Sequence, residues 1–346
     1  MPADETDPIG HAPHAAISFE GAAKRYADGT VAVEDLDLEV SAGELMVFVG
    51  PSGCGKSTSL RMVNRLVELT AGRVLVDGED VRHVDPVRLR RRIGYVIQNV
   101  GLFPHRTVEQ NVGVVPALLG WSRERTRSRS RELLELVGLD ADLHARRYPH
   151  ELSGGQRQRV GVARALAAEP SVLLMDEPFG AVDPVGRRRL QAEFRRLHAE
   201  LGTTVIFVTH DIDEAVLLGD RVAVFRQGGH VEQVADPVTL LAAPANETVR
   251  SFIGADRAVR LLALTGIEAE DLSPAAPGAS PALTVGDTLD VALSVLAESP
   301  APTIGVRGDD GELVGSLDAD AIYRALRRVY SAHPDPLAEP VATPNS

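Results

Sequence analysis

The segment Gly50–Thr58, GPSGCGKST, has residue types and spacing that suit it to holding phosphate. Gly50 and Gly55 have four residues between them and are followed by Lys56 and Ser57. Glycines let backbone N–H groups turn toward the phosphates, a lysine reaches the β- and γ-phosphates, and a hydroxyl ligates Mg²⁺. An apolar run precedes the loop and a helix-forming segment follows it, as such a site requires. The nucleotide contacts are therefore assigned to Gly50, Ser52, Gly53, Cys54, Gly55, Lys56, Ser57 and Thr58.

An Asp-Glu pair ends a second apolar run, SVLLMDEP. Asp176 stands where a carboxylate can hold the coordination shell of a metal, and Glu177 is placed to polarise the water that attacks in phosphoryl transfer. Taken alone, such a pair is equally typical of a turn at a strand end. Together with the phosphate loop, it predicts a site that hydrolyses a nucleotide.

A second glycine-rich segment, ELSGGQRQR, lies at Glu151–Arg159. Ser153, Gly154 and Gly155 precede a stretch with helical periodicity, GQRQRVGVARALAAE. The free N–H groups at a helix N-terminus attract an anion, so this segment suits a further phosphate contact. Ser153 also suits the role of helix N-cap, and the two interpretations are compatible.

The elements around these segments indicate an α/β fold. Short β-rich runs from Ala15 onward, with turn signals ADGT and SAGE, predict an antiparallel β layer that leads into the buried strand LMVFVG. The runs SVLLMDEP and TTVIFVTH predict further buried strands, which alternate with the helical segments KSTSLRMVNRLVEL and RRRLQAEFRRLHAEL. This alternation is typical of a parallel sheet covered by helices. Helical periodicity between about residues 100 and 168 predicts an inserted helical subdomain, and DRVAVFRQGGHVEQV predicts a hairpin-like pair.

The composition changes beyond Arg250, and the stretch LSPAAPGASP that follows is rich in Pro, Ala and Ser and predicts a linker. After it, the pattern predicts a helix over Leu289–Glu298, a hairpin at Gly308–Gly311 and a final helix from Ala319. The predicted division of the chain is a flexible tail (1–14), a nucleotide-hydrolysing domain (15–255), a linker (256–282), a small α+β unit (283–330) and a disordered tail (331–346).

Composition and charge exclude several classes of protein. No apolar run reaches the roughly 18 residues that span a bilayer, and the acidic N-terminus is unlike a signal peptide, so we expect a cytoplasmic protein. A formal net charge of −13 argues against a dedicated nucleic-acid binder. The lone cysteine, Cys54, cannot form an intrachain disulfide. Arginine clusters such as SRERTRSRSR are interpreted as solvated helix faces.

The segment ELSGGQRQR resembles the signature of ATP-binding cassette (ABC) ATPases, and the resemblance extends over about residues 15–255. The stretches GYVIQN, GAVDP and VTHD stand in the order that this family shows. The resemblance implies a P-loop NTPase of the ABC type, with ATP and Mg²⁺ as cofactors. It also implies that two copies pair head to tail, so that the signature of one copy lies over the γ-phosphate held by Lys56 of the other.

The resemblance implies roles for single residues. Tyr26 would stack on adenine, and His210 would contact the γ-phosphate and orient Glu177. Glu177 and His210 are thus the implied catalytic pair. The implied metal contacts are Ser57, Gln98 and Asp176. The contacts that span the dimer are assigned to Ser153, Gly154, Gly155, Gln156 and Asp183.

Longer stretches, including GYVIQNVGLFPHRTVEQNV, VPALLGWSRER and FIGADRA, resemble the importers of glycine betaine, choline, carnitine and proline. This implies an ATPase at the cytoplasmic face of the membrane that serves a separate permease and, indirectly, a substrate-binding protein. Another small-solute importer, for instance of amino acids, is the alternative. An ABC ATPase acting on DNA or ribosomes usually has two fused cassettes, coiled-coil or zinc insertions, or basic arms, and the sequence has none of them. The presence of Glu177 and His210 argues against a purely regulatory binding module without catalysis.

Residues 283–330 resemble one cystathionine-β-synthase (CBS) motif, a regulatory unit that usually occurs in pairs. Only one copy is apparent in the sequence. Nucleotide-binding CBS motifs carry Ser or Thr and then Asp three residues later, whereas this chain has Asp318 and Ala321. The departure argues against an adenosine phosphate ligand there.

Overall fold

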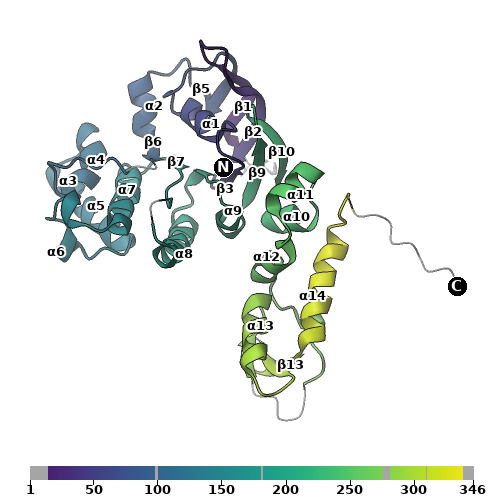
Figure 1. The fold of residues 1–346 in the computed structure, drawn as a ribbon. Helices are drawn as coiled ribbons and strands as arrows, with labels where there is room; N and C mark the ends of the chain where they lie inside the picture. Colours follow the sequence, from purple (N-terminus) through teal and green to yellow (C-terminus); the bar gives the residue numbers. More distant parts are fainter. Residues whose placement is uncertain (1–14, 98–99, 181, 276–280, 309, 338–346) are drawn as a thin grey trace, which may run out of the picture. The chain divides into compact units, whose positions relative to one another are not determined.

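The computed structural model describes residues 15–97, 100–180, 182–275, 281–308 and 310–337 (Figure 1). Contacts between residues divide the chain into two compact units. The first comprises residues 1–210 and 225–230, and the second comprises residues 211–224 and 231–346. The described candidate site residues all belong to the first unit.

The first unit begins with a four-stranded antiparallel sheet in the order β2-β1-β4-β5. The strands are β1 (Ala15–Arg25), β2 (Val31–Ser41), β4 (Ala71–Val76) and β5 (Glu79–Asp80). Along β2, Leu36, Leu38 and Val40 are buried while Asp37 and Glu39 are exposed, as expected of a strand with one covered face. The predicted antiparallel layer is confirmed.

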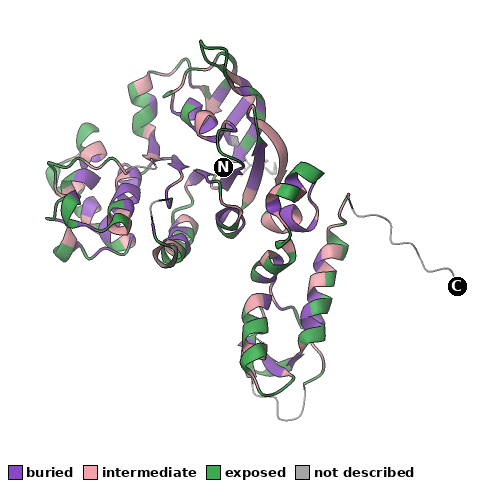
Figure 2. Cartoon of the chain, viewed as in Figure 1, coloured by how far each residue is buried: buried purple, intermediate pink, exposed green. Residues whose placement is uncertain are grey.

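Four parallel strands lie next to one another in the second sheet, in the order β3-β8-β7-β6, with β6 at the edge. They are β3 (Leu45–Val49), β6 (Ile93–Val96), β7 (Val172–Asp176) and β8 (Thr204–Val208). Every residue of β3, β7 and β8 is buried, which is why these strands read as continuous apolar runs (Figure 2). Strand β9 (Arg221–Arg226) contributes Phe225, whose ring centroid lies 4.8 Å from that of Phe48. The carboxyl ends of β3, β7 and β8 therefore meet at one edge of the sheet.

Helices flank these strands and fill the predicted insertion. Helix α8 (Pro184–Leu201) buries Leu190, Phe194 and Leu197, which recur at helical spacing, and Phe194 contacts Phe207 of β8 with ring centroids 6.3 Å apart. All regular elements in the described part of the predicted helical subdomain are helices. They are α3 (Val108–Val112), α4 (Val114–Leu118), α5 (Arg123–Leu136), α6 (Ala141–His144), the 3₁₀ turn Pro149–Glu151 and α7 (Gly154–Leu166).

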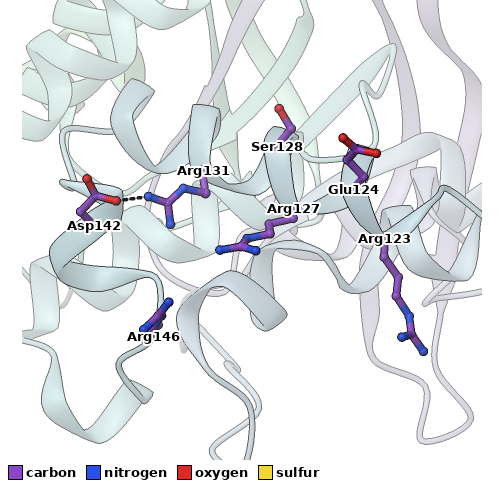
Figure 3. Close-up of a pocket in the computed structure, with 7 residues that line it drawn as sticks. All are labelled: Arg123, Glu124, Arg127, Ser128, Arg131, Asp142 and Arg146. Atoms are coloured by element: carbon purple, nitrogen blue, oxygen red, sulfur yellow. Dashed lines mark hydrogen bonds and ion pairs between the residues drawn. The ribbon is translucent and has the colours of Figure 1, made fainter.

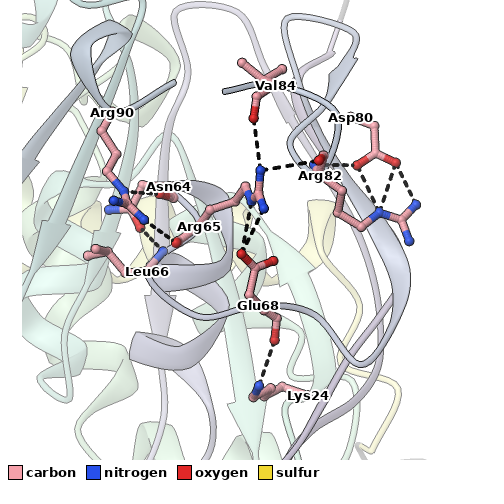
Figure 4. Close-up of polar contacts among 9 residues, drawn as sticks. All are labelled: Lys24, Asn64, Arg65, Leu66, Glu68, Asp80, Arg82, Val84 and Arg90. Atoms are coloured by element: carbon pink, nitrogen blue, oxygen red, sulfur yellow. Dashed lines mark hydrogen bonds and ion pairs between the residues drawn. The ribbon is translucent and has the colours of Figure 1, made fainter. Parts of the chain in front are cut away.

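Helix α1 (Lys56–Val63) is shorter than the sequence predicted, since the helical pattern extended to Leu69. Arg90 of α2 (Pro86–Arg92) accounts for the difference (Figure 4). Its Nε donates to the carbonyl of Asn64 at 3.1 Å, and its Nη2 donates to that of Arg65 at 2.6 Å. Arg65 itself has a left-handed φ of 51°. The carbonyls of Asn64 and Arg65, which would accept hydrogen bonds if the helix continued, thus accept from α2.

The second unit contains a three-stranded sheet in the order β11-β12-β13, with β11 parallel to β12 and β13 antiparallel to it. Its buried core includes Leu283, Ile304, Val306, Leu317 and Ala321. The elements of the unit, in chain order, are α9 (Ile212–Leu218), β10 (His230–Ala235), α10 (Pro237–Ala242), α11 (Glu247–Ile253), α12 (Arg257–Leu264), the 3₁₀ turn Ala269–Asp271, β11 (Pro281–Thr284), α13 (Leu289–Glu298), β12 (Ile304–Arg307), β13 (Leu313–Leu317) and α14 (Ala319–Ala332). The helix predicted over Leu289–Glu298 and the one predicted from Ala319 are confirmed.

The segment interpreted as a linker, residues 256–282, differs from that expectation. Helix α12 lies within it, and Leu262 and Ile267 belong to the core of the second unit. Ser273 forms a β-bridge with Ser316. The start of the predicted disordered tail is also structured, because α14 extends to Ala332. Residues 276–280, the tail 1–14 and residues 338–346 lie outside the described part of the chain.

Candidate functional site

Three glycines shape the loop between β3 and α1. Gly50, Gly53 and Gly55 have φ of 152°, 79° and 110°, values that residues with a Cβ rarely adopt. A Cβ at Gly50 would lie 2.3 Å from the carbonyl oxygen of Phe225, and one at Gly55 would lie 2.4 Å from that of Ala32. Only glycine therefore fits the first and third of these positions.

The side chain of Lys56 is turned back into the loop and is 5% exposed. Its Nζ donates to the carbonyls of Gly50 at 2.7 Å and Pro51 at 2.9 Å, and it lies 3.5 Å from the buried Sγ of Cys54. A buried ammonium that is held by neutral acceptors remains available to a stronger anionic partner. The loop encloses a cavity of about 170 Å³, lined by Ala32, Ser52, Gly53, Cys54, Gly55, Lys56, Ser57, Thr58 and Glu177.

The carboxylate of Asp176, at the end of β7, is held through both of its oxygens. Ser57 Oγ donates to Oδ1 at 2.7 Å, and Arg61 Nη2 donates to Oδ2 at 3.1 Å. Interaction with Tyr95 and then the charge of Asp176 raise the pKa of Arg61 above its ordinary value, although partial burial opposes this. Burial raises the pKa of Tyr95. The sequence predicted Ser57 and Asp176, and the structure brings them together.

Arg61 and Tyr95 were missed from the sequence. Arg61 follows Ser57 by four residues, so helical spacing alone places the two side chains on one face of α1. That spacing was the available signal for Arg61. Tyr95 lies on β6, and nothing local in the sequence connects it to the end of β7.

Glu177 follows β7 directly and has an unusual backbone conformation, with φ of 46°. Its N–H donates to the carbonyl of Val208 at 3.0 Å, which fixes the turn against β8. Its Oε1 lies 3.2 Å from Nδ1 of His210, which follows the same strand β8. A carboxylate and an imidazole therefore meet beside the cavity. The imidazole side chain is 58% exposed, and that of Glu177 is 23% exposed.

Ser153 and Gln156 form a capping box at the start of α7. The Oγ of Ser153 accepts from the N–H of Gln156 at 3.3 Å, and Oε1 of Gln156 accepts from the N–H of Ser153 at 2.9 Å. Ser153 and Gly154 are exposed, and Gly155 and Gln156 are partly exposed. None of these four lines the cavity of its own chain. The predicted N-cap role of Ser153 is confirmed.

Tyr26 and Asp183 lie apart from the cavity lining. Tyr26 occupies the turn between β1 and β2 and is 41% exposed, with the Nζ of Lys24 5.1 Å from its ring centroid. Asp183 caps α8 by accepting from the N–H of Gly186 at 2.9 Å. Gln98 lies outside the described residues.

Comparison with known proteins places these features in context. Residues 33–180 match a family model described as ABC transporter. The choline transport ATP-binding protein OpuBA of Bacillus subtilis is 44% identical over 312 residues, 90% of this chain and 81% of that protein. The osmoprotectant import ATP-binding protein OsmV of Salmonella typhimurium is 49% identical over 284 residues, 82% of this chain and 73% of that protein. A solved structure of the dimeric cassette MJ0796, in a post-hydrolysis state with ADP and Pi, has a TM-score of 0.58 and 33% identity over 64% of this chain and 98% of its own.

One further observation concerns the membrane. Within the part of the chain that the structure describes, no helix has both the length and the apolar character needed to cross a bilayer.

Proposed function

The chain belongs to the ATP-binding subunits of ABC transporters, and on that premise we propose that its ATP hydrolysis powers uptake of an osmoprotectant through a separate permease. The proposed solutes are glycine betaine, choline or proline. Relatives named for choline and osmoprotectant transport support this solute class. The observation that carries the hydrolytic part is that Lys56, Ser57 and Glu177 line one cavity.

ATP would be held by the phosphate loop and Tyr26. Lys56 would exchange its carbonyl partners for oxygens of the β- and γ-phosphates, because a charge-assisted hydrogen bond is stronger than a neutral one. The half-exposed ring of Tyr26 would stack on adenine. The nearby cation of Lys24 would add to the attraction for an anionic nucleotide.

Ser57 and Asp176 would hold Mg²⁺, with Gln98 as the third proposed contact. A hydroxyl and a carboxylate oxygen 2.7 Å apart fit a hard cation that prefers oxygen. No cluster of three or more His, Cys, Asp or Glu side chains suitable for a metal occurs among the described residues. That agrees with Mg²⁺, which is typically bound by one or two carboxylates together with phosphate and water. When bound, the ion would neutralise charge that develops on the phosphates.

Glu177 is the proposed catalytic base, and His210 is proposed to orient it. Their separation of 3.2 Å supports this assignment, because the imidazole restricts the position of the carboxylate. A positioned carboxylate beside the phosphates can accept a proton from the attacking water.

A second copy of the chain would complete the site. Ser153, Gly154, Gly155 and Gln156 are at least partly exposed and lie outside the cavity of their own chain, so they are available to a nucleotide held by another copy. The N-terminus of the 13-residue helix α7 would direct N–H groups at its γ-phosphate. Asp183 is proposed as a further contact across the dimer. Solved structures of the similar protein MJ0796 are dimeric, which supports pairing of two copies of this chain.

We further propose that the chain sits at the cytoplasmic face of the membrane, bound to the permease and only indirectly linked to a substrate-binding protein. Residues 15–255 would form the hydrolysing domain and residues 283–330 a regulatory unit of CBS type. The order strand, helix, strand, strand, helix from β11 to α14 supports the second assignment. Asp318 caps α14 by accepting from the N–H of Ala321 at 2.7 Å, so its carboxylate stabilises the start of that helix.

The function is tested by uptake into proteoliposomes that contain the chain and the integral membrane protein that co-purifies with it. ATP-dependent uptake of labelled glycine betaine, choline or proline is expected. Uptake of an unrelated amino acid in place of these solutes would favour the other importer class. ATPase activity without any co-purifying membrane protein would contradict a role in transport.

A further inference from the structure

Helix α5 carries a stripe of arginines that the proposed function does not use. Arg123, Arg127 and Arg131 follow one another at intervals of four residues, so they share one helix face and extend over about 12 Å of its axis. Together with Arg146, which follows α6, they line a hollow of about 790 Å³ (Figure 3). We call this the arginine hollow; its lining residues are Arg123, Glu124, Arg127, Ser128, Arg131, Asp142 and Arg146.

Carboxylates of the chain neutralise only part of this positive charge. Arg131 forms an ion pair with Asp142 and lies 3.9 Å from Glu109. Arg127 lies 3.7 Å from the same Glu109 oxygen, so two guanidinium groups share one carboxylate. The side chain of Asp142 is 87% exposed, and a screened surface pair of this kind is easily exchanged for another anion.

The other two guanidinium groups have no such partner. Within the described residues, neither Arg123 nor Arg146 has a side-chain hydrogen bond or an ion pair. The opposite side of the same helix behaves differently, because Arg125 and Arg129 lie 3.8 Å and 3.9 Å from Glu169. Like charges four residues apart repel one another and destabilise a helix. An external anion bound between these arginines would reduce the repulsion and stabilise α5.

We propose that the arginine hollow binds a phosphate-bearing anion, either a free oligophosphate or the headgroups of anionic phospholipid. The guanidinium fork matches phosphate oxygens in pairs. The lining has no apolar or aromatic side chain to hold a nucleobase or the anchor residues of a peptide, so recognition rests on charge. Because the whole chain has a net charge of −13, local contacts rather than a long-range field must hold the anion.

The test uses the full-length chain with Lys56→Ala, which removes the main cation of the phosphate loop, and tripolyphosphate as the probe in calorimetric titration. In this background, Arg127→Gln with Arg146→Gln is expected to weaken binding about 100-fold, since each charge-assisted pair contributes about ten-fold. Arg196→Gln is the matched control, because it removes an exposed helical arginine that lies outside the hollow. Arg127→Lys with Arg146→Lys, which keeps the charge but loses the fork, is expected to fall between the two. Circular dichroism verifies that each variant is folded.

Co-sedimentation with phosphatidylglycerol or phosphatidylcholine vesicles separates the two sources of phosphate. Binding of tripolyphosphate without vesicle binding assigns the hollow to a free oligophosphate. Vesicle binding that requires phosphatidylglycerol, is competed by tripolyphosphate and is lost in the double variant assigns it to lipid. Equal binding by the parent and the double variant, or no binding of either probe, overturns the proposal. Binding of a glutamate-rich peptide alone also overturns it, since the surface would then recognise protein.

Discussion

At the scale of single residues, Lys56 and Glu177 line the same cavity, but they act at different stages of the proposed reaction. Lys56 would bind the phosphates before the reaction, so Lys56→Ala is expected to weaken both nucleotide affinity and turnover. A hydrogen bond to a charged group contributes about 1.5–3 kcal/mol, which corresponds to about a 10- to 150-fold weaker affinity for ATP. A fluorescent ATP analogue measures this directly, with Arg196→Ala as the control. Unchanged affinity would contradict the assignment of Lys56.

Glu177→Gln has a different expected outcome, because it keeps the size of the side chain and leaves the phosphate loop intact. ATP should still bind, while hydrolysis should fall by about 10²- to 10⁴-fold, the usual contribution of a general base. Phosphate release measured beside nucleotide binding separates the two effects. Glu200→Gln, an exposed glutamate on α8, is the matched control. Wild-type turnover in Glu177→Gln would mean that another group accepts the proton.

At the scale of elements, the sequence predicted those features whose causes are local. The glycine loop, the buried strands and the Ser153 cap depend on neighbours within a few residues, and they were found from the sequence. The early end of α1 was not, because it depends on Arg90, which lies 26 residues beyond Asn64. Helix α12 was interpreted as linker because its packing against α10, α13 and α14 is not visible in the local composition. Arg61 and Asp176 are 115 residues apart, and only the fold brings them into contact.

Asp335 connects the end of α14 to two earlier helices of the second unit. It accepts from Arg250 at 2.8 Å and from Arg257 at 3.0 Å, and its side chain is 11% exposed. Asp335→Asn is therefore expected to destabilise this junction by about 1–3 kcal/mol, seen as faster hydrogen exchange in α14. Glu298→Gln, an exposed change on α13, is the control. Equal exchange rates in the two variants would show that the ion pairs do not stabilise the junction.

The same carboxylate gives the junction a defined pH dependence. Burial alone would raise the pKa of Asp335, but the N–H of Leu337 and the two arginines outweigh it, so the pKa lies below the ordinary value of 3.8. A carboxyl group whose pKa is lower in the folded state than in the unfolded state stabilises the folded state. This contribution is complete when the pH is above the unfolded-state pKa, and it is lost as the pH falls through the folded-state pKa. The difference between Asp335→Asn and the parent should therefore persist at neutral pH and disappear only in strong acid.

At the scale of the whole molecule, the C-terminal region is expected to modulate transport and to take no part in the chemistry. It is acidic, with 14 Asp and Glu against six Arg in residues 256–346, so salt should change how it docks. Removing residues 267–346 keeps α12, which packs on α10, and should leave Mg²⁺-dependent ATPase activity nearly intact. Uptake by that truncated form should respond differently to ionic strength. Superimposable uptake curves would eliminate the modulating role.

The position of the cut provides a control. Removing residues 256–346 also deletes α12 and uncovers α10, whose Leu240 and Leu241 are fully buried. Burial of a leucine side chain contributes about 1.5–3 kcal/mol, so the longer deletion should lower the melting temperature more than the shorter one. Equal melting temperatures would mean that α12 does not protect α10.

The left-handed φ of 46° at Glu177 implies that stability and catalytic activity conflict at this position. A residue with a Cβ strains the backbone there by about 1–2 kcal/mol, and glycine does not. Glu177→Gly and Glu177→Ala both delete the carboxylate and its contact with His210. The difference in stability between the two variants therefore reports the backbone strain alone. We expect the glycine variant to be the more stable of the two by about 1 kcal/mol in chemical denaturation, and both to be inactive. The most stable variant of this turn would then be unable to hydrolyse ATP. The active enzyme therefore keeps a backbone strain that no substitution of Glu177 can relieve without loss of hydrolysis.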